Sequence, residues 1–342
     1  MTALFYHPYV DRILKINVQT VNSEAAMKNT KFYLGVDGGG SKTTAVVFNE
    51  KGEFICKACG ESINYYSVGI ENARKAMADI IGNLSQKSFD CAVIGMSALN
   101  ERASKEETDR FCNGIIESKK IIMDSDLFVA LEAMDEDGEC AVVISGTGSM
   151  ALYRNSEGII SHAGGWGYIL GDEGSGYSIG LSGIKAAIRA AEGSEEKTAL
   201  TEECLSYFSI GNIYDLIDLY YDKKVSRKTT AAFAKNVISL AETGDKTADN
   251  IIRNEAKLLS ETVRALLCNA KKDIKIGLWG GIFQHNKFFR DYFISNLKES
   301  GFELVKLISF TPETGAVFAC FKEDGIEVVD IIKNNIIESY KQ

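Results

Sequence analysis

The sequence lacks the features that mark several large classes of protein. Basic residues are not in excess, because 38 Lys and Arg stand against 47 Asp and Glu, a net charge of -9. Such a chain does not favour nucleic acid or an anionic membrane as its partner. No apolar run approaches the ~20 residues that span a bilayer, and the scattered charges of residues 1–18 are unlike a signal peptide. We expect a cytoplasmic protein.

Paired cysteine motifs are also scarce. Among the eight cysteines, only Cys56 and Cys59 have a metal-like spacing, and no second pair completes a four-thiolate site. Cysteines without a partner motif in a reducing compartment are usually small apolar side chains. We interpret this pair as two thiols of a strand that ends near a turn.

The length of the chain permits two domains. A chain of 342 residues with 45% hydrophobic and 25% charged residues has the composition of a globular protein with room for two cores. Residues 1–30 are predicted to be an N-terminal extension of unknown function, because "MKNTKFYLGVDGG" leads from Met27 almost directly into an apolar strand. Residues 250–270 have the periodicity of a packed helix, and residues 241–250 are predicted to be a polar loop.

Three successive glycines in "YLGVDGGGSKTTAVVF", residues 33–48, indicate a phosphate-binding loop. The P-loop pattern fails, because counting from Gly35 places Ser41 where its lysine should be. The dinucleotide fingerprint needs a helix after the glycines, whereas the β-branched and aromatic residues 44–48 predict a strand. The segment therefore predicts a β-hairpin with a glycine tip.

Such a tip can bind phosphate, since glycine lets backbone N–H groups approach an anion closely. Asp37, at the end of the first strand, would hold Mg²⁺ through water. The alternative is an ordinary tight hairpin. The residues predicted to contact the nucleotide here are Gly38, Gly39, Gly40, Ser41, Lys42 and Thr43.

The pattern recurs about a hundred residues later. "CAVVISGTGSMALYRNSEGII", residues 140–160, is again a strand, a glycine-rich tip, a strand, a turn and an apolar run. Two such hairpins predict a duplicated unit whose halves face each other across a cleft and hold phosphate from both sides. Two unrelated hairpins are the alternative.

With the segment "HAGGWGYILGDEGSGYSIG", residues 162–180, the chain resembles the N-acetylglucosamine kinase family and its broader relatives, the BadF/BadG/BcrA/BcrD (benzoyl-CoA reductase activator-like) ATPases. The resemblance covers roughly residues 31–320 and places the chain in the actin-like superfamily. It implies an α/β fold of two ribonuclease-H-like domains with an interdomain cleft. These would be residues 31–139, with a terminal helix in 323–342 packing back on them, and residues 140–322.

The resemblance implies a kinase that uses ATP and Mg²⁺ to phosphorylate the 6-hydroxyl of N-acetylglucosamine or a close amino sugar. N-acetylmuramic acid and glucosamine stay open as substrates, and a homodimer is possible. A sugar sensor without catalysis is disfavoured by the acidic residues and by both phosphate loops. An iron–sulfur activator ATPase is disfavoured because "GDEGSGYSIG", residues 171–180, contains no cysteine.

The resemblance also assigns residues. Asp126 would be the catalytic base. The further nucleotide contacts would be Gly146, Thr147, Gly148, Gly280 and Gly281. The sugar contacts would be Asn64, Tyr65, Asp126, Ser149, Met150, Gly165, Trp166, Gly167 and Asp172, although the family commonly has a polar residue in place of Met150.

Several of these residues have structural alternatives. Asp126 follows an apolar run and precedes a helical pattern, so it could be a helix N-cap, and Asp124 could exchange roles with it. Asp172 could complement the dipole of a helix that begins near Ser175. Trp166 could be a core aromatic residue, although its flanking glycines favour a wall of the sugar site.

Overall fold

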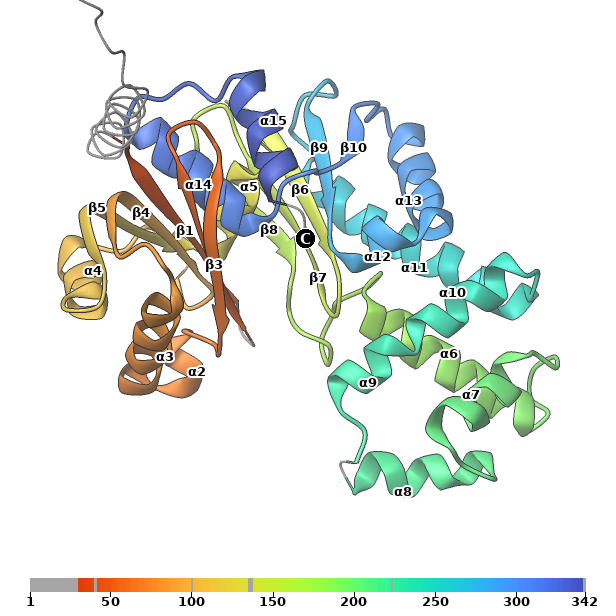
Figure 1. The fold of residues 1–342 in the computed structure, drawn as a ribbon. Helices are drawn as coiled ribbons and strands as arrows, with labels where there is room; N and C mark the ends of the chain where they lie inside the picture. The colour runs from red at the N-terminus through yellow and green to blue at the C-terminus, as the bar shows by residue number, and fades with distance from the viewer. Residues whose placement is uncertain (1–29, 40–41, 100, 135–137, 223, 341–342) are drawn as a thin grey trace, which may run out of the picture. The chain divides into compact units, whose positions relative to one another are not determined.

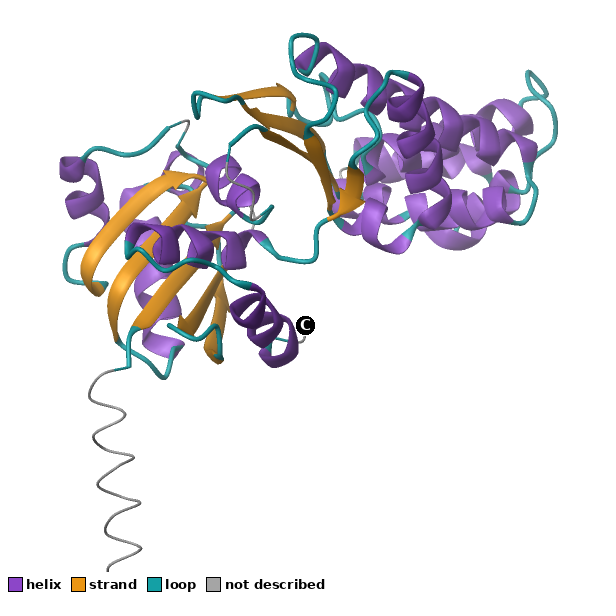
Figure 2. Ribbon diagram, turned by 90° about the horizontal axis from the view of Figure 1, so that it is seen from above, coloured by secondary structure: helices purple, strands orange, loops and turns teal. Residues whose placement is uncertain are grey.

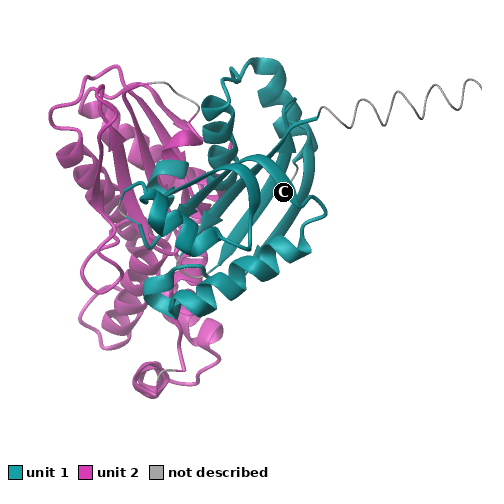
Figure 3. Cartoon of the chain, turned by 90° about the vertical axis from the view of Figure 1, so that its left-hand side faces the viewer, with its two compact units in different colours: residues 1–129, 312–342 teal, residues 130–311 magenta. Residues whose placement is uncertain are grey.

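The computed structural model describes residues 30–39, 42–99, 101–134, 138–222 and 224–340. Residues 1–29, with nearly all of the predicted extension, and two predicted phosphate contacts, Gly40 and Ser41, lie outside these ranges. The chain forms two compact units: residues 1–129 with 312–342, and residues 130–311 (Figure 3). Each unit contains one five-stranded sheet and its own hydrophobic core.

The sheet of unit 1 has the order β3-β2-β1-β4-β5. β1 pairs antiparallel with β2 and parallel with β4, and β5 extends the parallel side. The central strands are buried on both faces, which suits their Val, Ile and Ala content. The strands are β1 (Phe32–Gly38), β2 (Thr43–Asn49), β3 (Phe54–Gly60), β4 (Ser88–Met96) and β5 (Glu117–Ser125).

Helices cover both sides of this sheet (Figures 1 and 2). α3 contacts β3, and α14 contacts β1 and β4. Gly35 allows this close approach, since a Cβ there would overlap the Glu313 carbonyl of α14. The helices are α2 (Tyr65–Val68), α3 (Ile70–Asn83), α4 (Lys105–Cys112), α14 (Pro312–Glu323) and α15 (Asp330–Ser339), while α5 (Asp126–Glu132) crosses the border between the units.

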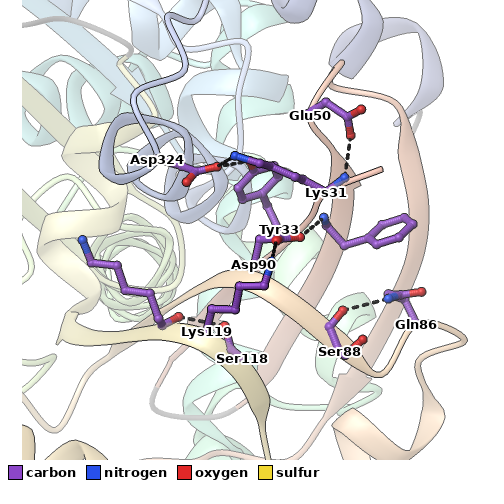
Figure 4. A network of polar contacts seen from close by, with 11 residues as sticks. Lys31, Tyr33, Glu50, Gln86, Ser88, Asp90, Ser118, Lys119 and Asp324 are labelled. Carbon is purple, nitrogen blue, oxygen red and sulfur yellow. Dashed lines mark hydrogen bonds and ion pairs between the residues drawn. The ribbon is translucent and has the colours of Figure 1, made fainter. Parts of the chain in front are cut away.

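Polar contacts fasten the C-terminal helices of the chain to the first strand. Asp324, just after α14, accepts hydrogen bonds from the Tyr33 hydroxyl and the Lys31 ammonium, each at 2.6 Å (Figure 4). Asp90 accepts from the amide of Phe32 at 2.9 Å. α15 contacts β3, and Tyr340 beyond it packs on Phe54. Segments from the two ends of the sequence therefore make up one unit.

The sheet of unit 2 repeats the topology of unit 1. Its order is β10-β9-β6-β7-β8, with β6 antiparallel to β7 and parallel to β9. Read from the third strand, both sheets have the order 3-2-1-4-5, so the predicted duplication is present. The strands are β6 (Cys140–Ser145), β7 (Ser149–Arg154), β8 (Ile160–Gly164), β9 (Lys275–Trp279) and β10 (Val305–Leu307).

Unit 2 is the more helical half. α11 follows the predicted periodicity but begins earlier than expected, because Asp245 caps it by accepting from the amide of Ala248. The predicted loop of residues 241–250 is thus confined to residues 243–245. The helices are α6 (Gly176–Ala191), α7 (Leu200–Phe208), η1 (Ile213–Asp215), α8 (Leu216–Tyr221), α9 (Arg227–Ala232), α10 (Ala234–Glu242), α11 (Lys246–Leu266), α12 (Gly281–His285) and α13 (Lys287–Glu299).

The borders of the units differ from those expected from sequence. Residues 130–139 group with the second unit and residues 312–322 with the first, because α14 packs on β1 and β4. Within the described ranges, none of the helices combines the length and apolarity needed to traverse a lipid bilayer.

Candidate active site

The first glycine-rich segment forms the predicted hairpin. β1 and β2 pair up to Gly38 and Thr43. Two hydrogen bonds from other segments support the tip. Ser62 Oγ donates to the Gly39 carbonyl and the Ser97 amide donates to the Gly38 carbonyl, both at 3.0 Å. The Thr43 hydroxyl is buried and has no hydrogen-bond partner among the described residues. A buried hydroxyl beside a glycine-rich turn is suited to a hydrogen bond with a ligand.

Asp37 lies at the carboxyl end of β1, as predicted. Burial raises the pKa of its carboxyl group, the nearby charges of Glu313 and Asp126 add to the rise and Lys42 opposes it, which together give a pKa of about 7. A carboxylate that is desolvated beside other carboxylates favours a bound cation. In the described part of the chain, no three His, Cys, Asp or Glu side chains are grouped to hold a metal ion. Mg²⁺ at Asp37 would therefore rely mainly on water and phosphate oxygens, as this ion often does.

Asp126 lies at the same edge of the sheet. β1, β4 and β5 are parallel, and Asp37 pairs in register with Gly95, which pairs with Asp124. Carboxyl ends of parallel strands meet at one edge, so Asp126, which follows β5, lies two strands and roughly 10 Å from Asp37. Gly95 makes room for the start of α5, because a Cβ there would overlap Val129.

The structure distinguishes the two aspartates at the end of β5. Asp124 is buried, pairs with Arg102 at 3.3 Å and accepts from the amide of Ser125. Ser125 caps α5, because its hydroxyl accepts from the amide of Phe128. Ser125, rather than Asp126, is therefore the N-cap of α5. Burial raises the pKa of Asp126 to about 6, although the amides of Leu127 and of Asp126 itself stabilise its ionised form.

Asn64 and Tyr65, the predicted sugar contacts of unit 1, already have partners. Asn64 Oδ1 caps α2 by accepting from the amides of Tyr66 and Ser67, and its Nδ2 donates to Ser97 Oγ at 3.1 Å. Tyr65 packs on Phe111. A sugar contact by either residue remains a prediction.

The second hairpin lies against an ion pair between a buried aspartate and an exposed arginine, which the sequence did not reveal. Asp172 is 3% exposed and accepts from Arg227 at 3.0 Å, and the amides of Ser149 and Gly167 also bond to its carboxylate. A Cβ on Gly148 would come within 2.8 Å of both the Asp172 and the Arg227 side chains. The tip of the β6–β7 hairpin therefore lies directly against this pair.

Several glycines of the 162–180 segment are needed for the conformation of the backbone. Gly164, Gly165 and Gly167 all adopt positive φ angles, between 74° and 81°. Residues that carry a Cβ rarely adopt such angles. Asp172 itself has φ 67°, a strained geometry that is concentrated at functional sites. Trp166 is 74% exposed, so it is not a core residue, and a role in sugar binding remains a prediction.

A pocket of about 660 Å³ opens beside the second hairpin. Gly146, Thr147 and Gly176, the first residue of α6, lie on its wall with Gly281, another predicted nucleotide contact. Gly280, which has φ 104°, packs against Ser145. The other residues of the wall are Lys228, Ala231, Ala232, Lys235, Ile282, His285 and Asn286. None of these described residues is acidic, so the pocket suits an anion.

Two lysines of this wall were missed by the sequence analysis. Lys228 and Lys235 are exposed, and neither has an ion-pair or hydrogen-bond partner in the described ranges. They lie seven residues apart, a spacing of about two helical turns. The basic pair of residues 227–228, which precedes a helical pattern, was the available signal, but it matches no phosphate-binding motif.

Comparison with known proteins identifies the family. The model of the BadF/BadG/BcrA/BcrD ATPase family matches residues 34–319. The N-acetylmuramic acid/N-acetylglucosamine kinase of Clostridium acetobutylicum is 31% identical over 304 residues, which are 86% of this chain and 99% of that protein. The chain belongs to the BadF/BadG/BcrA/BcrD ATPase family. This confirms the expected family. It also confirms the expected class of enzyme, an ATP-dependent sugar kinase.

Two further comparisons extend this result. The glucosamine kinase GspK of Vibrio cholerae is 27% identical over 66% of this chain and 76% of its own length. A candidate N-acetylglucosamine kinase from Chromobacterium violaceum has a crystal structure that superposes with a TM-score of 0.65 at 21% identity, covering 84% of this chain and 98% of that chain. The expected α/β fold of two related halves is confirmed.

Proposed function

We propose that this kinase transfers the γ-phosphate of ATP to the 6-hydroxyl of N-acetylglucosamine or a close amino sugar. The relatives act on N-acetylmuramic acid, N-acetylglucosamine and glucosamine by name, so the substrate belongs to this group. The observation that carries the proposal is Asp126: a carboxylate at the end of β5 that is not the N-cap of α5, because Ser125 is, with a pKa of about 6.

Phosphoryl transfer to a sugar needs little covalent chemistry from the protein. The hydroxyl oxygen bonds to the γ-phosphorus, the bond from that phosphorus to the β–γ bridging oxygen breaks, and ADP leaves. Asp126 takes the proton of the hydroxyl. A base with a pKa near 6 is mostly ionised at neutral pH yet still accepts a proton late in the reaction.

The nucleotide would occupy the pocket of unit 2. Its phosphates would meet the Gly146–Thr147 tip near the N-terminus of α6, where the helix dipole favours negative charge. Lys228 and Lys235 would add positive charge along the wall. Mg²⁺, when bound, would neutralise the charge of the transferred phosphate, and Asp37 would be its protein ligand.

An ATP-dependent screen of amino sugars tests the proposal. ADP release would be followed with N-acetylglucosamine, N-acetylmuramic acid and glucosamine, with glucose as a control, and ³¹P and ¹³C NMR would locate the new ester. We expect phosphate on carbon 6. If no amino sugar is phosphorylated by a protein that binds ADP, the proposed reaction is refuted; phosphate on another carbon refutes the position.

A further inference from the structure

Glu255 is a buried carboxylate to which the proposed reaction gives no role. It is 3% exposed and lies on the buried stripe of α11 that also contains Ile252, Ala256 and Leu259. Burying a charge is costly unless its hydrogen bonds are satisfied. The partners of Glu255 therefore indicate what it does.

All three of its partners belong to the start of α6 or the turn before it. Oε2 accepts from the amide of Gly174 at 2.8 Å. Oε1 accepts from the hydroxyls of Ser178 at 2.9 Å and Ser182 at 3.0 Å. Among the described residues, no Lys, Arg or His forms an ion pair with it. One carboxylate of α11 thus holds the segment that leads into α6.

The segment that leads into α6 also forms hydrogen bonds with the second glycine-rich hairpin. The carbonyl of Gly174 accepts from Ser145 Oγ at 2.7 Å, and the amide of Gly176 donates to the carbonyl of Gly146 at 2.7 Å. Gly174 has φ 73°, and a Cβ there would lie 2.7 Å from Leu259 Cβ. The segment therefore has no room to shift while Glu255 holds it.

We propose that Glu255 is a positioning residue that fixes the β6–β7 hairpin in the geometry that receives the nucleotide phosphates. The inference rests on the proposed function, because it concerns the same nucleotide site. Glu255 accepts from Gly174, and Gly174 accepts from Ser145, one residue before the tip. An ionised carboxylate only accepts hydrogen bonds, so the Gly174 amide and both hydroxyls are directed toward it.

Substitution of Glu255 tests this chain of contacts. Glu255→Ala leaves the Gly174 amide without its partner and should raise the KM for ATP and the Kd for ADP about tenfold or more. The KM for the amino sugar should change less than threefold, because Arg227 and two amides hold Asp172 independently. Glu255→Gln can still accept from Gly174 and donate to the hydroxyls, so it should restore both constants to within about threefold.

The matched control is Glu261→Ala on the same helix. The Glu261 side chain is half-exposed and lies 3.9 Å from Lys257, so its loss should leave both constants unchanged. Ser145→Ala breaks the next contact and should raise the KM for ATP. In the double variant with Glu255→Ala the two effects should be less than additive, as for residues of one network.

The outcomes separate this inference from the proposed function. If the wild-type chain binds no ADP, the proposed function fails and the inference falls with it. If the wild-type chain binds ADP and folded Glu255→Ala binds it within threefold as well, only the inference is overturned. If Glu255→Ala does not fold, Ser145→Ala decides: a raised KM for ATP supports the positioning role, and an unchanged KM refutes it.

Discussion

Replacement of Asp126 by Asn tests the proposed base most directly, because it removes the proton acceptor and little else. The side chain keeps its size, and Ser125 still caps α5. A general base contributes about 10²–10⁴-fold to the rate, so kcat should fall by that factor. The Kd for ADP should stay within about twofold, since Asp126 does not line the pocket of unit 2.

The pH profile supplies a second measure. With a pKa of about 6, Asp126 is about 90% ionised at pH 7 and about 10% ionised at pH 5. With Mg²⁺ and ATP saturating, the kcat/KM of the wild-type enzyme for the amino sugar should therefore fall about tenfold per pH unit on the acidic side of 6. The residual activity of Asp126→Asn should lack this limb.

The same substitution should stabilise the fold at alkaline pH. The folded pKa lies above the ordinary 3.8, so the folded state binds more protons between these values and loses stability as pH rises through them. The ionised carboxylate then lowers the free energy of unfolding by about 1–3 kcal/mol, and the lower value allows for the exposed part of the side chain. Asp126→Asn should raise Tm by ~2–10 °C at pH 8, and by little near pH 4.

Two results would refute the reasoning. Turnover within tenfold of the wild type would show that Asp126 is not the base. A lower Tm at pH 8 would show that the carboxylate stabilises the fold and that the pKa argument is wrong. Asp124→Asn is the matched control: it should leave the acidic limb of the profile in place.

Four further predictions follow from single contacts. Because the pKa of Asp37 is about 7, Mg²⁺-dependent ADP binding, measured by calorimetry, should weaken toward pH 6, and Asp37→Asn should abolish this dependence. Replacing Lys228 and Lys235 together by Gln should weaken ADP at least tenfold and adenosine less than twofold; equal losses would contradict a phosphate role. Gly148→Ala should lower the kcat/KM for the amino sugar, because the added Cβ would displace the Asp172 and Arg227 side chains. Tyr33→Phe should cost about 1–2 kcal/mol in denaturant unfolding through its lost bond to Asp324.

The strands and their turns could be read from the sequence because local chemistry determines them. β-branched residues after the first glycine run argued against a helix, and a hairpin formed there. The second hairpin was predicted from its likeness to the first, and it also formed. The start of α6 was equally local, since Ser175 caps it through the amide of Ser178. The end of β5 placed Asp126 at the strand-to-helix junction, but the sequence left open whether it was a cap. Only the contact of Ser125 with Phe128 answered that question.

The contacts that support the second hairpin could not be read locally, because they join segments far apart in the chain. Arg227 pairs with Asp172 across 55 positions, and no spacing rule covers such a distance. Glu255 left a fainter signal: a charged residue within the apolar stripe of α11, between Ile252 and Leu259. A buried charge on a packed helix face calls for a partner, but the sequence does not say that the partner is a phosphate-binding hairpin.

The acidic edge of unit 1 connects the fold with the chemistry. The parallel order of β1, β4 and β5 brings the ends of β1 and β5 to one edge of the sheet, so Asp37 and Asp126 are desolvated near one another and the charge of Asp126 raises the pKa of Asp37. Without ligand, this arrangement weakens the fold. It suits an edge at which a cation and a transferred phosphate neutralise the carboxylates during turnover, because carboxylates with perturbed pKa values concentrate at functional sites. Mg²⁺ and nucleotide together should therefore lower the pKa of Asp37, whereas a purely structural carboxylate would keep its pKa when they bind.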